Sequence, residues 1–94
     1  MAICLAVADR LKLRRCRGSI WRDDNRELYV DQDPGEVREA CMGGLVYLAV
    51  RLGEVSSKEG YNLMIALEKA LKGRLISDAN DHDGFTFQQF ADIL

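Results

Sequence analysis

Acidic side chains gather around Gly84 near the end of the chain, in the stretch 78–90, DANDHDGFTFQQF. An EF-hand calcium loop needs oxygen ligands at positions one, three and five, glycine at six and a bidentate glutamate at twelve. Placing Gly84 at six puts Asp81 and Asp83 at three and five, but it leaves Ala79 at one and a phenylalanine at twelve. Because the first and last ligands are missing, we interpret the stretch as a polar turn that caps the last helix, with no metal bound.

A second candidate for chemistry is a basic cluster in the first quarter of the chain, with two aromatic residues beside it. Its members are Arg10, Lys12, Arg14, Arg15, Arg17, Arg22 and Arg26, with Trp21 and Tyr29 nearby. Arginine grips phosphate and aromatic rings stack on bases, so a nucleic-acid or anionic-nucleotide binder is one hypothesis. The isoelectric point of about 5.3 is far from that of a typical nucleic-acid-binding domain. We favour a solvated face that is partly paired with acidic residues of the same chain or of a neighbouring copy.

The cysteines, serines and the single histidine do not form a catalytic set by spacing. His82 lies between Asp81 and Asp83, and neighbouring residues cannot hydrogen-bond as a triad unless the chain folds back. No cysteine pair has C-x-x-C spacing, and we expect Cys4 and Cys41 to be small buried hydrophobic residues on helices. The sequence thus predicts no enzyme, no cofactor and no structural metal. A small hydrolase or transferase that uses Asp81 and His82 is the weakest alternative.

The first quarter predicts a helix followed by a β-hairpin. Helical spacing of apolar residues over 3–13 puts four side chains on one face: Cys4, Val7, Ala8 and Leu11. Residues 19–21 and 27–30 are typical of short strands, and Asp23-Asp24-Asn25 between them is typical of a turn.

The strongest helix-start signal lies at Asp33, Pro34 and Glu36, which fit the N-cap, N1 and N3 positions. We expect a helix from there through Leu52, with an apolar face that includes Cys41. Paired glycines at 43–44 cost about 1 kcal/mol each inside a helix, so another element should pack against that backbone.

The second half predicts two further helices. Ser56 with Glu59 is a capping box that begins one of them, which ends near Gly73. A polar loop is expected over 77–84, and Thr86 with a glutamine three residues on begins the last helix. The predicted fold is therefore α+β and mostly helical, a single domain over 1–94 with about four helices and a small β-hairpin after the first.

Composition suits a small soluble globule. The chain has 94 residues, 48% of them hydrophobic, and no apolar stretch near the roughly 20 residues that a membrane span needs. The start of the chain lacks a basic leader, so we expect a cytoplasmic protein, or one of the host cytoplasm if a phage encodes it. The first 26 residues carry seven basic and three acidic groups, and the other 68 carry six and twelve. This asymmetry suits a homo-oligomer or one protein partner, with no membrane.

Five short motifs follow one another along the chain: Cys16-Arg-Gly18, Arg22-Asp-Asp-Asn25, Cys41-Met-Gly-Gly44-Leu45, Asn80-Asp81 and Gly84-Phe-Thr86. This order resembles the domain-of-unknown-function family 6197, which comprises small proteins of bacteria and their phages. The resemblance extends over nearly the whole chain. It implies a small α-rich fold and a frequent origin in phages or mobile elements, and it implies no activity.

We expect a non-catalytic protein-binding module, with a phage-encoded modulator or inhibitor of a host defence protein as the specific hypothesis. Tyr47 and Tyr61 lie off the strongest apolar stripes, which would leave aromatic surface for a partner. Asn80 and Asp81 hold a loop by side-chain-to-backbone bonds in our preferred interpretation, and in the functional one they meet the Arg15/Arg17 region on one surface. The candidate binding residues are Arg14, Arg15, Arg17, Trp21, Arg22, Asn80 and Asp81.

Overall fold

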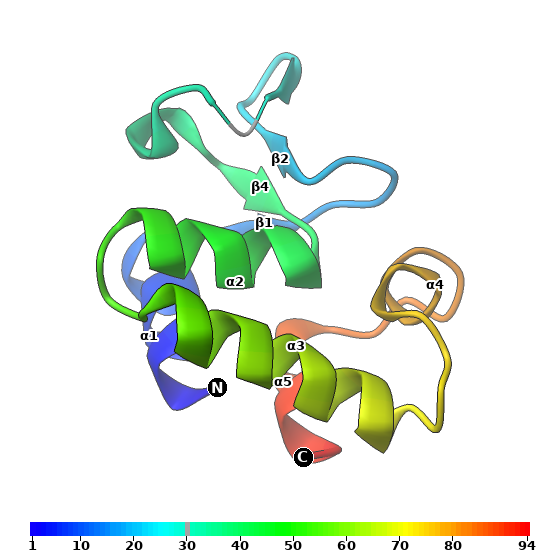
Figure 1. The fold of residues 1–94 in the computed structure, drawn as a ribbon. Helices are drawn as coiled ribbons and strands as arrows, with labels where there is room; N and C mark the ends of the chain where they lie inside the picture. The colour runs from blue at the N-terminus through cyan, green and yellow to red at the C-terminus, as the bar shows by residue number, and fades with distance from the viewer. Residues whose placement is uncertain (30) are drawn as a thin grey trace.

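The computed structural model describes residues 1–29 and 31–94, which form an α+β fold (Figure 1). The helices are α1 (Ala2–Arg10), α2 (Met42–Arg51), α3 (Ser57–Ala70), α4 (Ile76–Asp81) and α5 (Phe87–Asp92), with a 3-10 turn, η1 (Pro34–Glu36). The strands are β1 (Arg14–Arg15), β2 (Trp21–Arg22), β3 (Glu27–Leu28) and β4 (Glu39–Ala40). The predicted class, mostly helical α+β, is confirmed.

The four strands form one small sheet in the order β1-β4-β2-β3. Strand β4 pairs parallel with β1 and antiparallel with β2, so a strand from the middle of the chain joins two from its first quarter. The predicted hairpin is confirmed, because β2 and β3 pair antiparallel. Its turn is held by Asp23, whose Oδ1 accepts the backbone N–H groups of Asn25 and Arg26. Val30, the predicted end of the second strand, lies outside the described residues.

Helix α2 is the centre of the molecule. The sheet lies on one side of it and α3 on the other, while α1, α4 and α5 close the rest (Figure 1). Met42, Leu45, Leu48 and Ala49 are all fully buried, so α2 is apolar around most of its circumference. The core around it is completed by large buried side chains from other elements: Val7, Trp21, Leu67 and Phe90.

The helix predicted over 34–52 is wrong in its first third. Asp33 does cap a turn, but its Oδ1 accepts only the N–H of Gly35, and the turn ends at Val37, which is extended. Residues 39–40 are instead the central strand of the sheet, with ladder partners on both sides. Two neighbouring strands satisfy the backbone of this segment, and that tertiary pairing outweighs the local helix-start signal.

The polar loop predicted over 77–84 is also wrong, because residues 76–81 form α4. One face of α4 buries Ile76, Ala79 and Asn80, which supplies the packing that a six-residue helix needs. The first helix ends at Arg10, earlier than predicted, and Leu11 is exposed.

Of the two other predicted helix starts, the capping box at Thr86 is confirmed in full and the one at Ser56 only in its N-cap half. Ser56 Oγ accepts the N–H of Glu59 at the start of α3, and Thr86 forms a complete capping box with Gln89 at the start of α5. The predicted end of α3 also holds, since Gly73 follows it with a positive φ of 84°.

Candidate functional site

Asn80 ties three distant segments together in the interior. Its side-chain amide donates to the carbonyl of Cys16 at 2.8 Å and to Asp81 Oδ1 at 2.8 Å. Its Oδ1 accepts the backbone N–H of Met42, the first residue of α2, at 3.2 Å. The side chain is fully buried. Asn80 makes the side-chain-to-backbone bonds that the structural interpretation expected, but they join α4 to distant segments and do not hold a loop.

The Arg15/Arg17 region does meet Asn80 and Asp81, as the functional hypothesis required. Arg15 Nη1 donates to the carbonyl of Asn80 at 2.6 Å, and the N–H of Gly18 donates to Asp81 Oδ1 at 3.2 Å. A Cβ on Gly84 would lie 3.1 Å from Arg17 Nη2, so this side chain also reaches the same corner. The contacts that join these segments use backbone carbonyls and amides, which is what a structural junction requires.

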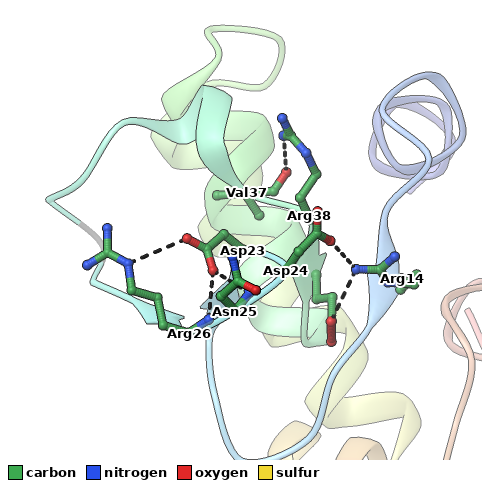
Figure 2. A network of polar contacts seen from close by, with 8 residues as sticks. Arg14, Asp23, Asp24, Asn25, Arg26, Val37 and Arg38 are labelled. Carbon is green, nitrogen blue, oxygen red and sulfur yellow. Dashed lines mark hydrogen bonds and ion pairs between the residues drawn. The ribbon is translucent and has the colours of Figure 1, made fainter.

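Other members of the basic cluster are paired with carboxylates, in agreement with the favoured interpretation. Arg10 makes a two-pronged contact with Glu54 at 2.7 and 2.8 Å, and this contact raises the pKa of Arg10 and lowers that of Glu54. On the sheet, Arg14 Nη2 lies 2.7 Å from Asp24 and 3.4 Å from Glu39 (Figure 2). Arg10, Arg14 and Arg26 are thus each held in a separate ion pair with carboxylates of the same chain.

Trp21 cannot stack on a base, and its assignment to a binding surface is corrected. The side chain is fully buried, and Nε1 donates to the carbonyl of Gly44 in α2 at 2.9 Å. Its ring packs 5.6 Å from that of Tyr47. Strand β2 points Trp21 into the core because Ala40 and Leu28, its ladder neighbours, are buried on the same face.

The acidic stretch does not have the backbone of a calcium loop, because residues 78–81 belong to α4 and residues 87–90 to α5. Asp83 forms an ion pair with Arg74 and Asp81 is engaged with Gly18 and Asn80. Across residues 1–29 and 31–94, no group of three or more His, Cys, Asp or Glu side chains is placed to hold a metal ion.

All three cysteine thiols have a raised pKa in the folded chain. Burial raises the pKa of Cys4, and burial with the proximity of Cys41 raises that of Cys16 to about 11. The prediction that Cys41 lies within a helix is wrong. Cys41 is the N-cap residue of α2, and its Sγ accepts the N–H of Gly44 at 3.2 Å. Burial still raises the pKa of Cys41 despite that hydrogen bond. Thiols of this kind are mostly protonated at neutral pH.

An apolar hollow of about 300 Å³ lies between α2 and α3. It is lined by the two tyrosines that lie off the predicted apolar faces of their helices. Tyr47 from α2 and Tyr61 from α3 line it, with 40% and 68% of their surface exposed. The other lining residues are Gly43, Val46, Val50, Ser57, Gly60 and Met64. We call these eight residues the α2–α3 groove.

Glycine shapes the α2–α3 groove at the helix crossing. A Cβ on Gly60 would lie 2.8 Å from Val50 Cγ2, so the bare backbone of α3 is what lets the two helices approach there. At Gly43 a Cβ would meet only Met64 Cε at 3.4 Å, an ordinary contact, so Gly43 lines the groove without being needed for the packing.

A second hollow of about 220 Å³ continues the groove, because Gly43 and Met64 line both. It extends the surface to Cys41, Leu75 and Glu68. Leu75 is 59% exposed, and Glu68 makes no ion pair within the described part of the chain. A wider hollow of about 620 Å³ lies between α1 and α5, and its lining is mixed, with Asp9, Lys12 and Gln88 beside apolar side chains.

The sequence predicts that Tyr47 and Tyr61 remain at the surface, but it does not predict the groove that they line. Met64 and Glu68 carried no signal, and the glycine pair at 43–44 indicated close packing but not a groove, since this surface arises only when α2 and α3 pack antiparallel across a short turn. Arg22, the remaining candidate, is half-buried on β2, opposite Glu27 of β3 and Glu39 of β4.

No helix among residues 1–29 and 31–94 is long and apolar enough to cross a membrane. A scan against models of protein families, a search of curated proteins and a search of solved structures each found no match to the chain.

Proposed function

We propose that the chain is a non-catalytic protein-binding module whose contact surface is the α2–α3 groove. The observation that carries this proposal is the pair of exposed tyrosines, Tyr47 and Tyr61, on the two walls of an apolar hollow that the chain itself does not fill. Tyrosine offers a large rigid ring and a polar hydroxyl, which is why it is enriched at the centres of protein interfaces.

The occupant we propose is an amphipathic helix of a partner protein. A groove between two packed helices matches the helix-in-groove mode, in which apolar side chains at i, i+3, i+4 and i+7 insert into the hollow. Met64 adds a flexible apolar wall that adapts to such side chains. Glu68 at the continued end has no basic partner in the described chain, so a lysine or arginine on the incoming helix would complement it.

The origin of the partner rests on the resemblance to family 6197. That resemblance makes a host protein, attacked or modulated by a phage or mobile element, the natural first candidate. Steric occupation of a host protein needs no chemistry, which is consistent with the raised pKa values of the buried thiols. The hypothesis of a nucleic-acid binder loses support, because Trp21 is in the core and Arg10 and Arg14 are paired with carboxylates.

Site-specific photocrosslinking tests the proposal. A benzophenone amino acid replaces Tyr61 in one protein and Tyr29 in another, and each is irradiated in lysate of a candidate host. Tyr29 is the matched control, because it is 73% exposed but lies on the hairpin, outside the groove. We expect one host protein to crosslink through position 61 and not through position 29.

The crosslinked protein is then purified and its affinity measured. We expect Tyr61→Ala to weaken binding by roughly 30-fold or more, the size typical of an interface hot spot, and Tyr29→Ala to change it less than about threefold. Crosslinking from position 29 alone, or an affinity that survives Tyr61→Ala and Tyr47→Ala, would place the interface elsewhere. Binding of a generic oligonucleotide that weakens steeply with salt would instead support the nucleic-acid hypothesis.

A further inference from the structure

Cys16 and Cys41 each follow directly after one of the paired parallel strands β1 and β4, and they lie beside each other there. The parallel ladder pairs Arg14 with Glu39 and Arg15 with Ala40. The N–H of Cys16 then donates to the carbonyl of Ala40 at 3.1 Å. The register therefore continues by one residue and places Cys16 beside Cys41, although 25 positions separate them in the sequence.

The two side chains also share one face of the sheet. Side chains alternate along a strand, so Cys16 lies on the face of Arg14, and Cys41 on the face of Glu39. That Arg14 and Glu39 share a face is shown by their contact at 3.4 Å. Cys41 is also near enough to contribute to the raised pKa of Cys16.

This placement suits the spacing of Cα atoms that a disulfide requires. Neighbouring strands lie about 4.8 Å apart, which falls within the roughly 4.4–6.8 Å between Cα atoms that a disulfide bridges. Cys4 has no such neighbour, because it is buried on α1 and both other thiols lie at the sheet. All three cysteines are free in this structure.

A small oxidant has a route to the pair. Cys41 is half-buried and lines two surface hollows of about 260 and 220 Å³. Cys16 is only 5% exposed, so Cys41 is the thiol that reacts first. The N–H of Gly44, which already points at Cys41 Sγ, would stabilise the thiolate as it forms.

We propose that Cys16 and Cys41 are an oxidation site that closes to a disulfide on reaction with a peroxide. Deprotonated Cys41 attacks one peroxide oxygen, the O–O bond breaks, and the departing hydroxide takes up the proton as water, leaving a sulfenic acid on Cys41. Cys16 then loses its proton and attacks the Cys41 sulfur, an S–S bond forms, and the sulfenic oxygen leaves as a second water. Two thiols are oxidised and one peroxide is reduced, and a thiol reductant reverses the change.

The test treats the folded protein with hydrogen peroxide and follows thiol count, intact mass and peptide map. We expect the three thiols to fall to one, the mass to fall by two hydrogens, and the map to link Cys16 to Cys41. The rate should rise with pH between 7 and 9, because the reacting species are thiolates. The bridge should raise the melting temperature by roughly 10 °C, since it closes a loop of some 25 residues.

Three variants give the controls. Cys16→Ser and Cys41→Ser keep a hydroxyl in place of each thiol, and neither should form a bridge or gain thermal stability with peroxide. Cys4→Ala should form the bridge like the parent protein. Retention of all three thiols, a bridge that includes Cys4, crosslinking between chains, or overoxidation of Cys41 without a bridge would each overturn the proposal. None of these readouts depends on the α2–α3 groove, so the two proposals fail separately.

Discussion

At the residue scale, two adjacent glycines in the first turn of α2 differ in how closely other residues pack against them. A Cβ on Gly44 would lie 2.2 Å from the carbonyl oxygen of Ile20, which is backbone and cannot move without disturbing β2. The same carbonyl accepts the N–H of Cys41, and the carbonyl of Gly44 accepts Trp21 Nε1. The predicted close approach at the glycine pair is therefore confirmed for Gly44. The backbone that approaches it is that of Ile20, the residue before β2.

Gly44→Ala should destabilise the protein by about 1–3 kcal/mol or more, because overpacking against backbone exceeds the gain of about 1 kcal/mol in helix propensity. Gly43→Ala is the matched control. Its Cβ meets only Met64 Cε at 3.4 Å, so it should be neutral or stabilising by up to about 1 kcal/mol. Urea unfolding followed by circular dichroism measures both. A Gly44→Ala protein more stable than the parent would contradict the contact.

At the scale of the elements, the short pieces of this fold depend on contacts with one another. Helix α4 has six residues and no side-chain cap, and the strands have two residues each. Such elements are not stable alone. Asn80 joins three of them, since it links α4, the segment after β1 and the first N–H of α2.

Asn80→Ala should therefore lower the free energy of unfolding by about 2–6 kcal/mol, because it leaves the Cys16 carbonyl and the Met42 N–H without hydrogen-bond partners at roughly 1–3 kcal/mol each. Asn62→Ala is the control, since Asn62 is exposed on α3 and alanine favours a helix. Chemical unfolding gives both values, and hydrogen exchange at Met42 locates the effect. A loss below about 0.5 kcal/mol would show that Asn80 does not hold the junction.

At the scale of the whole molecule, the opposite charges of the two ends of the sequence are used largely within the chain. Arg10 of α1 pairs with Glu54 between α2 and α3, and the Arg15–Gly18 segment meets Asn80 and Asp81. The Arg15–Gly18 segment thus already contacts the acidic stretch of its own chain, through the carbonyl of Asn80 and the carboxylate of Asp81. Self-association stays a prediction. We expect a second copy of the chain to compete with a protein partner for the α2–α3 groove.

Acid should weaken the protein through the carboxylates whose pKa is lowered in the folded state. The Arg10 contact lowers the pKa of Glu54 below its ordinary 4.5, and the turn N–H groups lower that of Asp23 below 3.8. A lowered folded pKa adds stability above the unfolded value, and this is lost as pH falls through the folded value. The free energy of unfolding should hence decline below about pH 4.5.

Glu54→Gln should flatten the upper part of that decline, while Glu36→Gln, on the exposed η1 turn, should leave it unchanged. Urea titrations at several pH values between neutral and about pH 3 measure the slopes. The effect should shrink at high salt, because both charges are at the surface. Identical slopes in the parent and the Glu54→Gln protein would contradict the Arg10–Glu54 pair.

The sequence by itself determined what depends on local chemistry: the α+β class, the caps at Ser56 and Thr86, the hairpin turn at Asp23, and the close approach at Gly44. The caps and the turn follow from hydrogen bonds to neighbours within four positions, and Gly44 indicated a close approach, although not its partner Ile20, because glycine is unfavourable inside a helix. It also left Tyr47 and Tyr61 over as surface for a partner, although it did not show that they face each other.

Only the tertiary structure decided features that depend on residues far apart in the chain. It made residues 39–40 a central strand in place of a helix, formed α4 over residues 76–81 where a loop was expected, and put Trp21 in the core instead of on a binding face. It also brought Cys16 beside Cys41 and formed the α2–α3 groove. All these features have the same physical reason. Backbone groups take the partners that leave fewest hydrogen bonds unmade, and apolar side chains take those that leave least of their surface exposed. Across 25 or more residues, no local pattern specifies which partner that is.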